Sequence, residues 1–343
     1  MDSPFSPSAT SRSSRPRTLS IGGATYDLFV RTDQSVVHEH EGKKMFSLPL
    51  GDKIRVNDVI STFGGGASNT SVGLSRLGCT ASFCGVVGDD QWGTTLLKHL
   101  ADERVQTDMA TVVENEASSF SLVLSAGNGE RVILTHPGTA RHLHDVTFDR
   151  EQAGHFDAVF LNHIHAESCV IEDDLIDTFV QNPSIHLSWN PGGCQIESGL
   201  REKNNALLVS HTAVLFLNKE EALAFTGTRT VKEALNILSR AGATIVCITD
   251  GPNGSFATDG KTYFHCPAGD CTVVDATGAG DAFGTGVTWA VLTGKDLPTA
   301  LQAGTINAMS VVSVIGAEEG LLTETQMQLS LKRSNLTVTA EPF

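Results

Sequence analysis

Two aspartates and a cluster of small residues stand together in the stretch DATGAGDAFGTGV, residues 275–287. The small and apolar residues of 281–294 recur at helical spacing, so a helix is expected to begin close to Asp281. Three small residues precede that aspartate: Gly278, Ala279 and Gly280. The unpaired N–H groups and positive dipole of a helix N-terminus bind anions, and small residues let a phosphate approach the backbone.

Asp281 therefore places a carboxylate beside a predicted anion site. A carboxylate in that position can take a proton from a hydroxyl that attacks the anion, which is the arrangement that phosphoryl transfer to an alcohol requires. The alternative is a helix start in which the aspartate is ordinary and the glycines serve close packing.

Two common phosphate-binding motifs are absent from the sequence. Gly260-Lys261-Thr262 lacks the earlier glycine of a P-loop, because Ser255 stands there, and in 278–284 the third glycine comes one residue late for a dinucleotide fingerprint.

The bulk composition narrows the class of protein. A net charge of −15 without a basic stripe argues against a nucleic acid partner. Seven cysteines without a C-x-x-C pair indicate neither a zinc site nor a disulfide framework, so a reducing, cytoplasmic setting is expected. No window approaches the ~20 apolar residues of a membrane span, so the protein is expected to be soluble. Residues 1–18 are rich in Ser, Pro and Arg, which favours disorder over an organelle transit peptide.

Short apolar runs alternate with helical patterns, which predicts an α/β fold with a doubly wound, mostly parallel sheet flanked by helices. Strands are expected at 19–24, 81–88, 157–162, 185–191, 213–218 and 244–251, with a further strand-like segment at 271–274. Helices are expected at 66–78, 219–227 and 231–242.

Two regions interrupt this alternation. Residues 28–62 hold mixed strands, and 119–134 read as a hairpin with its turn at 127–129, so both are expected to form a small β lid over the site. The expected organisation is a tail at 1–18, one domain at 19–335 and a second tail at 336–343.

Four motifs resemble those of one known family. DATGAGDAFGTG (275–286) resembles the C-terminal signature of the ribokinase-like, phosphofructokinase B type carbohydrate kinases, and FGGGASNTSVGLSRLG (63–78) resembles their N-terminal signature. Between them, NKEE (218–221) is similar to the family's N-x-x-E motif and TDGPNG (249–254) to its T-x-G-x-x-G nucleotide loop. The motifs occur in the family's order, and the resemblance spans roughly residues 19 to 320.

The resemblance implies roles on the acceptor side of the site. Asp281 would deprotonate the acceptor hydroxyl, while the backbone at 278–280 neutralises charge on the transferred group. Asp27 would accept two sugar hydroxyls, unless it is an exposed turn aspartate. Further hydroxyl contacts would come from Gly65, Gly66 and Asn69, although Asn69 could equally cap a helix.

On the nucleotide side, the resemblance implies ATP as co-substrate and Mg²⁺ as cofactor. The residues expected to bind the nucleotide are Asn218, Thr249, Gly251, Gly254 and Asn307. Glu221 would hold Mg²⁺ through water, and Asp275 would bind a monovalent cation such as K⁺. Helix capping is the alternative for Asn218 and Glu221, and an ordinary position on a helix face is the alternative for Asn307.

Two departures from the family pattern leave the acceptor open. Ala276 stands where threonine is usual, and Gly66 stands where ribokinases carry lysine, which weakens an assignment to ribose. Histidine pairs at 38/40, 142/144 and 163/165 lack a third ligand at diagnostic spacing, so solvated or lid-face histidines are favoured over a metal site.

The sequence thus predicts an ATP-dependent kinase that phosphorylates a hydroxymethyl group of a sugar or similar alcohol, forming a homodimer through its lid. One alternative is a nucleoside kinase of the same superfamily, with Phe29, Phe46 and Phe120 available to clamp a base. The other is a regulator that binds a nucleotide or sugar without turnover, against which the intact Asp281 speaks.

Overall fold

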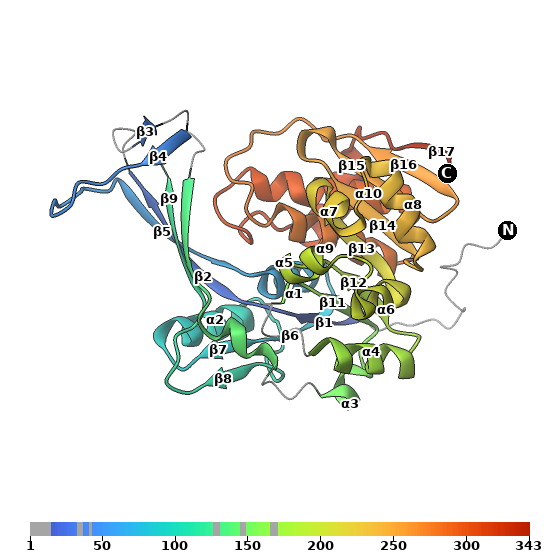
Figure 1. The fold of residues 1–343 in the computed structure, drawn as a ribbon, viewed down its shortest axis with the longest axis horizontal. Helices are drawn as coiled ribbons and strands as arrows, with labels where there is room; N and C mark the ends of the chain where they lie inside the picture. Colours follow the sequence, from blue (N-terminus) through green and yellow to red (C-terminus); the bar gives the residue numbers. More distant parts are fainter. Residues whose placement is uncertain (1–14, 33–36, 41–42, 126–130, 145–148, 165–170) are drawn as a thin grey trace.

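The computed structural model describes residues 15–32, 37–40, 43–125, 131–144, 149–164 and 171–343 (Figure 1). The hairpin turn expected at 127–129 and one of the paired histidines, residue 165, lie outside these ranges. In the described part of the chain, no helix is both long enough and apolar enough to cross a membrane.

A nine-stranded sheet forms the centre of the molecule. Its strands, in spatial order, are β17 (Thr339–Pro342), β16 (Thr262–Cys266), β15 (Ser255–Thr258), β14 (Ile245–Thr249), β13 (Thr212–Asn218), β12 (His186–Trp189), β11 (Ala158–Leu161), β1 (Arg17–Ile21) and β6 (Thr80–Cys84). In this spatial order, the six strands from β14 to β6 are parallel to one another, and each of the other three pairs antiparallel with its neighbour. The predicted α/β, mostly parallel sheet is therefore confirmed.

Alternate residues of the central strands enter two separate cores, because successive side chains of a strand point to opposite faces. On β13, Phe216 belongs to one core and Leu217 to the other. The first core is covered by α1 (Gly66–Arg76), α2 (Gln91–Asp102), α9 (Ala279–Leu292), α10 (Leu297–Val312) and α11 (Glu324–Arg333). The second is covered by α3 (Arg150–Ala153), α4 (Ile171–Gln181), α6 (Lys203–His211), α7 (Lys219–Thr226) and α8 (Val231–Arg240), with the short α5 (Gly193–Ser198) beside α7.

A separate four-stranded sheet projects from one side of this body, as Figure 1 shows, and we call it the lid. Its strands, in order, are β10 (Arg131–His136), β9 (Phe120–Ser125), β2 (Thr25–Arg31) and β5 (Asp58–Gly64). At its base the Tyr26 ring lies 4.4 Å from that of Trp92 in α2, which anchors the sheet to the body. Two further pairs, β3 (Val37–His40) with β4 (Lys43–Phe46) and β7 (Val86–Gly88) with β8 (Thr111–Val113), complete the described strands.

Several expected boundaries differ in the structure. Residues 271–274 form no strand, because β14 takes β15 as its neighbour and leaves this segment as a loop with Val273 64% exposed. The segment 81–88 divides into β6 and β7. The chain joins the sheet at Arg17, and the expected C-terminal tail instead adds the edge strand β17, where Phe343 stacks on Tyr263.

Candidate active site

The carboxylate of Asp281 lies where two helices from opposite ends of the sequence meet. Helix α9 begins at the N-cap Gly278, whose φ of 77° is a left-handed conformation that glycine adopts without strain. Asp281 falls in its first turn and accepts a hydrogen bond of 2.7 Å from Asn69 Nδ2 of α1. The two residues are 212 positions apart in the sequence, so tertiary packing brings the predicted base and the predicted hydroxyl ligand together.

The environment of Asp281 suits a proton acceptor. Burial away from water raises the pKa of its carboxyl group to about 6, the charges of Glu318 and Glu221 raise the pKa further, and the Asn69 hydrogen bond opposes the shift. A base with a pKa just below neutral is ionised at pH 7 and still accepts a proton readily.

Asp27 lies beside Gly64, close to the start of α1, although not in a turn. It stands in the middle of lid strand β2 and is 8% exposed, so the alternative of an exposed turn aspartate is wrong. Burial raises its pKa to about 6, a hydrogen bond from Ser121 opposes the shift, and the charges of Glu318 and Asp275 add to it. The lid thus contributes a second carboxylate with a perturbed pKa.

The backbone at residues 64–66, where β5 ends and α1 begins, lies close to neighbouring groups. A Cβ at Gly64 would lie 2.3 Å from Asp27 Oδ2, and one at Gly65 would lie 2.6 Å from the carbonyl oxygen of Gly23. A Cβ at Gly66 would lie 2.9 Å from Cβ of Asn162, a buried residue at the end of β11 that the sequence analysis did not single out. Bare backbone at 64–66 therefore lets the lid and the sheet meet at the site.

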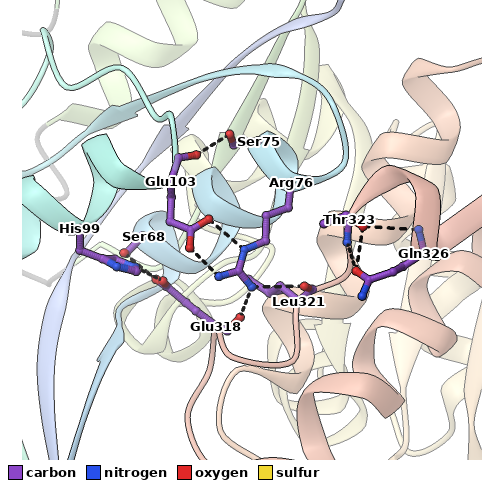
Figure 2. A network of polar contacts seen from close by, with 9 residues as sticks. All are labelled: Ser68, Ser75, Arg76, His99, Glu103, Glu318, Leu321, Thr323 and Gln326. Atoms are coloured by element: carbon purple, nitrogen blue, oxygen red, sulfur yellow. Dashed lines mark hydrogen bonds and ion pairs between the residues drawn. The ribbon is translucent and has the colours of Figure 1, made fainter.

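A buried acid behind the site was also not identified from the sequence. Figure 2 shows Glu318 between two helices, where it accepts hydrogen bonds from Ser68 Oγ of α1 at 2.7 Å and lies 2.5 Å from His99 Nε2 of α2. Arg76 donates to the carbonyl oxygen of Glu318 at 2.6 Å and pairs with Glu103. This network holds in place the carboxylate of Glu318, whose charge raises the pKa of both Asp27 and Asp281. The sequence around Glu318 contains no local pattern that would indicate this role.

A cavity of about 620 Å³ opens beside the N-terminus of α9. Five of the predicted residues line it: Thr249, Gly251, Gly254, Ala279 and Gly280. Much of the remaining lining is apolar and comes from α9 and α10, with Phe283, Ala308, Met309 and Val312. These wall residues were missed because small and apolar positions on a helix face look the same whether they face a core or a ligand.

Other predicted nucleotide and metal ligands have roles within the protein. Asn218 and Glu221 form a capping box at the start of α7, with Glu221 N donating to Asn218 Oδ1 at 2.9 Å and Asn218 N donating to Glu221 Oε2 at 2.8 Å. Asn307 is buried; its Nδ2 donates to the carbonyl oxygen of Ala282, and its Oδ1 accepts from Leu322 N. Neither asparagine is among the residues that line the cavity.

Asp275 accepts hydrogen bonds from other groups of the protein. Arg131 Nη1 of lid strand β10 donates to its Oδ1 at 2.8 Å, and Thr277 Oγ1 donates to the same oxygen at 2.8 Å. The loop before α9 is therefore tied to the lid by an ion pair.

Comparison with known proteins identifies the family of the chain. The profile described as pfkB family carbohydrate kinase matches residues 19–324. A ribokinase of Bacillus subtilis is 27% identical over 309 residues, covering 90% of this chain and 97% of its own. An uncharacterized sugar kinase of Archaeoglobus fulgidus is 28% identical over 254 residues, covering 73% of this chain and 98% of its own.

Solved structures share the fold. The ribokinase of Arabidopsis thaliana complexed with ribose and ATP superposes with a TM-score of 0.76 at 21% identity, covering 93% of this chain and 100% of that one. A Burkholderia thailandensis nucleoside kinase in complex with inosine gives a TM-score of 0.73 at 19% identity, covering 93% and 98%.

The fold and the family match define an enzyme class, the carbohydrate kinases. The chain belongs to the pfkB family of that class.

Proposed function

We propose that this kinase transfers the γ-phosphoryl group of ATP to a hydroxyl, preferably a hydroxymethyl group, of a sugar or sugar-like alcohol, with Asp281 as the general base. The observation that carries the proposal is the position of Asp281 in the first turn of α9, beside a cavity lined by Ala279 and Gly280. The relatives named ribokinase and sugar kinase support the substrate class.

In this proposal each group has one task. The carboxylate of Asp281 takes the proton of the acceptor hydroxyl, and the backbone N–H groups at the start of α9 stabilise charge on the transferred phosphoryl oxygens. Asp27 and Asn69 orient the acceptor from the lid and from α1. The Asn69 hydrogen bond keeps the carboxylate of Asp281 directed into the site before the acceptor arrives.

We include Mg²⁺ in the proposal, held mainly by the phosphates and its own waters and only indirectly by the protein. No group of three His, Cys, Asp or Glu side chains within the described ranges is arranged to hold a metal ion. The capping box uses Glu221 Oε2 and leaves Oε1 for a water of a phosphate-bound ion, and Glu221 lies close enough to raise the pKa of Asp281. Mg²⁺ would offset the phosphate charge as it keeps most of its hydration shell.

A nucleoside is the second candidate for the acceptor, and one observation favours it. A cavity of about 320 Å³ lies between the lid and the loop before α9, and its lid wall includes the apolar side chains of Phe29, Ile60 and Val123. An apolar wall of this kind suits a flat base better than a sugar. Phe120 is less suited to clamp a base, because it packs 5.7 Å from Trp92 at the base of the lid.

A cytoplasmic location and a homodimer through the lid complete the proposal. The buried thiols of Cys79, Cys84, Cys247 and Cys266 suit a reducing compartment. Val59 and Leu134 of the lid are 56% and 53% exposed, and exposed apolar patches often mark protein contacts. The mass in solution of Leu134→Asp against the unmodified protein tests this contact, and an unchanged dimer or a monomeric parent would rule it out.

The decisive experiment measures ADP release with ATP and Mg²⁺ against pentoses, hexoses, polyols and nucleosides. Turnover of one acceptor that is lost in Asp281→Asn supports the assignment. Binding of ATP and an acceptor without turnover by the unmodified protein would instead identify a regulator.

A further inference from the structure

Asp275 holds a carboxylate in a place from which water is nearly excluded. Its side chain is 5% exposed, and a buried carboxylate needs partners that offset its lost hydration. Besides Arg131, Thr277 donates to Oδ1 from its N–H at 3.1 Å and from Oγ1 at 2.8 Å. Gly316 N donates to Oδ2 at 3.2 Å. Only Arg131 among these donors brings a positive charge.

These contacts do not fit the monovalent cation expected at Asp275. Oδ1 already accepts three donors, whereas one oxygen of an ionised carboxylate offers about two lone-pair positions. The carbonyl oxygen of Val312, beside the same segment, accepts the N–H groups of Val274 at 2.7 Å and of Asp275 at 3.2 Å. Asp275 Oδ1 and the carbonyl oxygen of Val312 are therefore engaged by protein donors, and the guanidinium of Arg131 supplies the positive charge that a cation would bring.

The same ion pair connects the two halves of the active site. Arg131 pairs with Ser125 in the β10–β9 ladder, and β9 pairs with β2, where Ser121 lies opposite Asp27. Arg131 on β10 therefore belongs to the sheet that carries the acceptor ligand Asp27. It also lines the cavity of about 320 Å³ together with Asp275, so the pair stands at the junction of lid and body.

On the body side, Asp275 shapes the loop that leads to the anion site. Its bonds to the N–H and hydroxyl of Thr277 fix the turn immediately before Gly278, where α9 begins. A Cβ at Gly278 would lie 2.5 Å from Cβ of Ala317, the residue after Gly316, so this turn is also packed from behind. A shift of Asp275 would therefore shift the amides at 279–280.

We propose that Arg131 is a positioning residue: it is the built-in counter-cation of Asp275, it holds the lid against the loop before α9, and it makes a bound monovalent cation unnecessary. Its effect on turnover rests on the proposed kinase function, whereas the replacement of a cation by the guanidinium can be measured without turnover.

The first test measures thermal unfolding in KCl and in choline chloride at equal ionic strength. The unmodified protein is expected to unfold at the same temperature in both salts. Arg131→Met is expected to be more stable in KCl, because K⁺ can then reach Asp275, and Arg131→Met/Asp275→Asn is expected to lose that difference. The control is Arg31→Met, since Arg31 lines the same cavity but pairs with Asp58 inside the lid at 3.6 Å. K⁺-specific stabilisation of the unmodified protein, or none in Arg131→Met, overturns the proposal.

The second test uses an acceptor that the unmodified enzyme phosphorylates. In choline chloride, Arg131→Met is expected to lose on the order of 10²-fold in kcat through misalignment, with a smaller change in the KM for ATP. Added K⁺ or guanidinium is expected to restore part of the rate. A variant that is slow only because its fold is damaged would not recover its rate in this way. Arg131→Lys keeps a positive charge and is the second variant if Arg131→Met fails to fold. It is expected to retain most of the activity and to show the same rate with and without K⁺.

An unchanged kcat in Arg131→Met, or activation of the unmodified enzyme by K⁺, contradicts the proposal. If the unmodified protein phosphorylates no acceptor, the proposed function fails, while the unfolding measurements still decide whether Arg131 replaces a cation.

Discussion

The proposed nucleotide side and the proposed acceptor side of this site differ in the groups that form them. The nucleotide side uses backbone: a glycine N-cap at 278, small residues at 279–280 and the turn at 251–254 line one cavity. The acceptor side uses side chains from three separate elements, namely Asp27 of the lid, Asn69 of α1 and Asp281 of α9. The difference predicts that changes on the acceptor side act through charge, and that changes on the nucleotide side act through shape.

The largest effect is expected from Asp281→Asn, which removes the proposed base and keeps an amide of the same size. We expect kcat to fall about 10²- to 10⁴-fold, the range of general base catalysis, with ATP binding nearly unchanged. Steady-state kinetics and calorimetric titration of ATP measure the two quantities. Normal turnover by this variant would remove Asp281 from the mechanism.

Gly278→Ala tests the shape of the nucleotide side. Its φ of 77° and the 2.5 Å approach to Cβ of Ala317 force the loop to move, so we expect a loss of about 10²-fold in kcat. Gly227→Ala is the control, because Gly227 has a φ of 69° with no atom within 4 Å of the added Cβ, and it caps α7. It should lose about 1 kcal/mol of stability from the left-handed conformation alone and keep its kcat. Equal kcat losses in both variants would mean that backbone strain at a left-handed residue lowers kcat wherever it lies, and not specifically at the start of α9.

Asp27→Asn tests the charge on the acceptor side. The variant should bind the acceptor less well and be more stable than the unmodified protein. The pKa of Asp27 is about 6 in the folded protein against 3.8 as its ordinary value, so the folded state binds the proton more tightly. Ionised Asp27 therefore destabilises the fold progressively as the pH rises from about 4 to about 6. The variant should gain about 3 kcal/mol in unfolding free energy above pH 6 and little below pH 4, while the KM for the acceptor rises. Denaturant unfolding across this range measures the gain, and a gain independent of pH would refute the electrostatic cause.

Glu318→Gln should give the smallest effect, a shift in pH dependence. The charge of Glu318 raises the pKa of Asp281 and of Asp27, so its removal should move the acid limb of the kcat/KM profile to lower pH. Glutamine can still accept from Ser68 and donate to His99, which preserves the packing. Glu319→Gln removes the same charge from an exposed neighbour and should leave the profile in place. Identical profiles for all three proteins would show that Glu318 is only structural.

Local patterns predicted the parts of the site that local backbone builds. The start of α9 at Gly278–Ala279, the turn at 251–254 and the α7 capping positions follow from glycine conformations and helix signals within a few residues. Asp27 was predicted as a ligand through the family resemblance, yet its place inside a lid strand was not, because β2 begins at Thr25, before the expected start at residue 28, and local patterns define element boundaries poorly.

By itself, the sequence determined the class of fold, the order of its elements and the helix start that carries Asp281, since hydrophobic periodicity and capping act over neighbouring residues. Only the tertiary structure decided that Arg131 meets Asp275 across 144 positions and that Glu318 meets Ser68 across 250. It also decided that Asn307 bonds within the body. Such contacts depend on which faces of distant elements become buried against each other, and that depends on the packing of the whole chain.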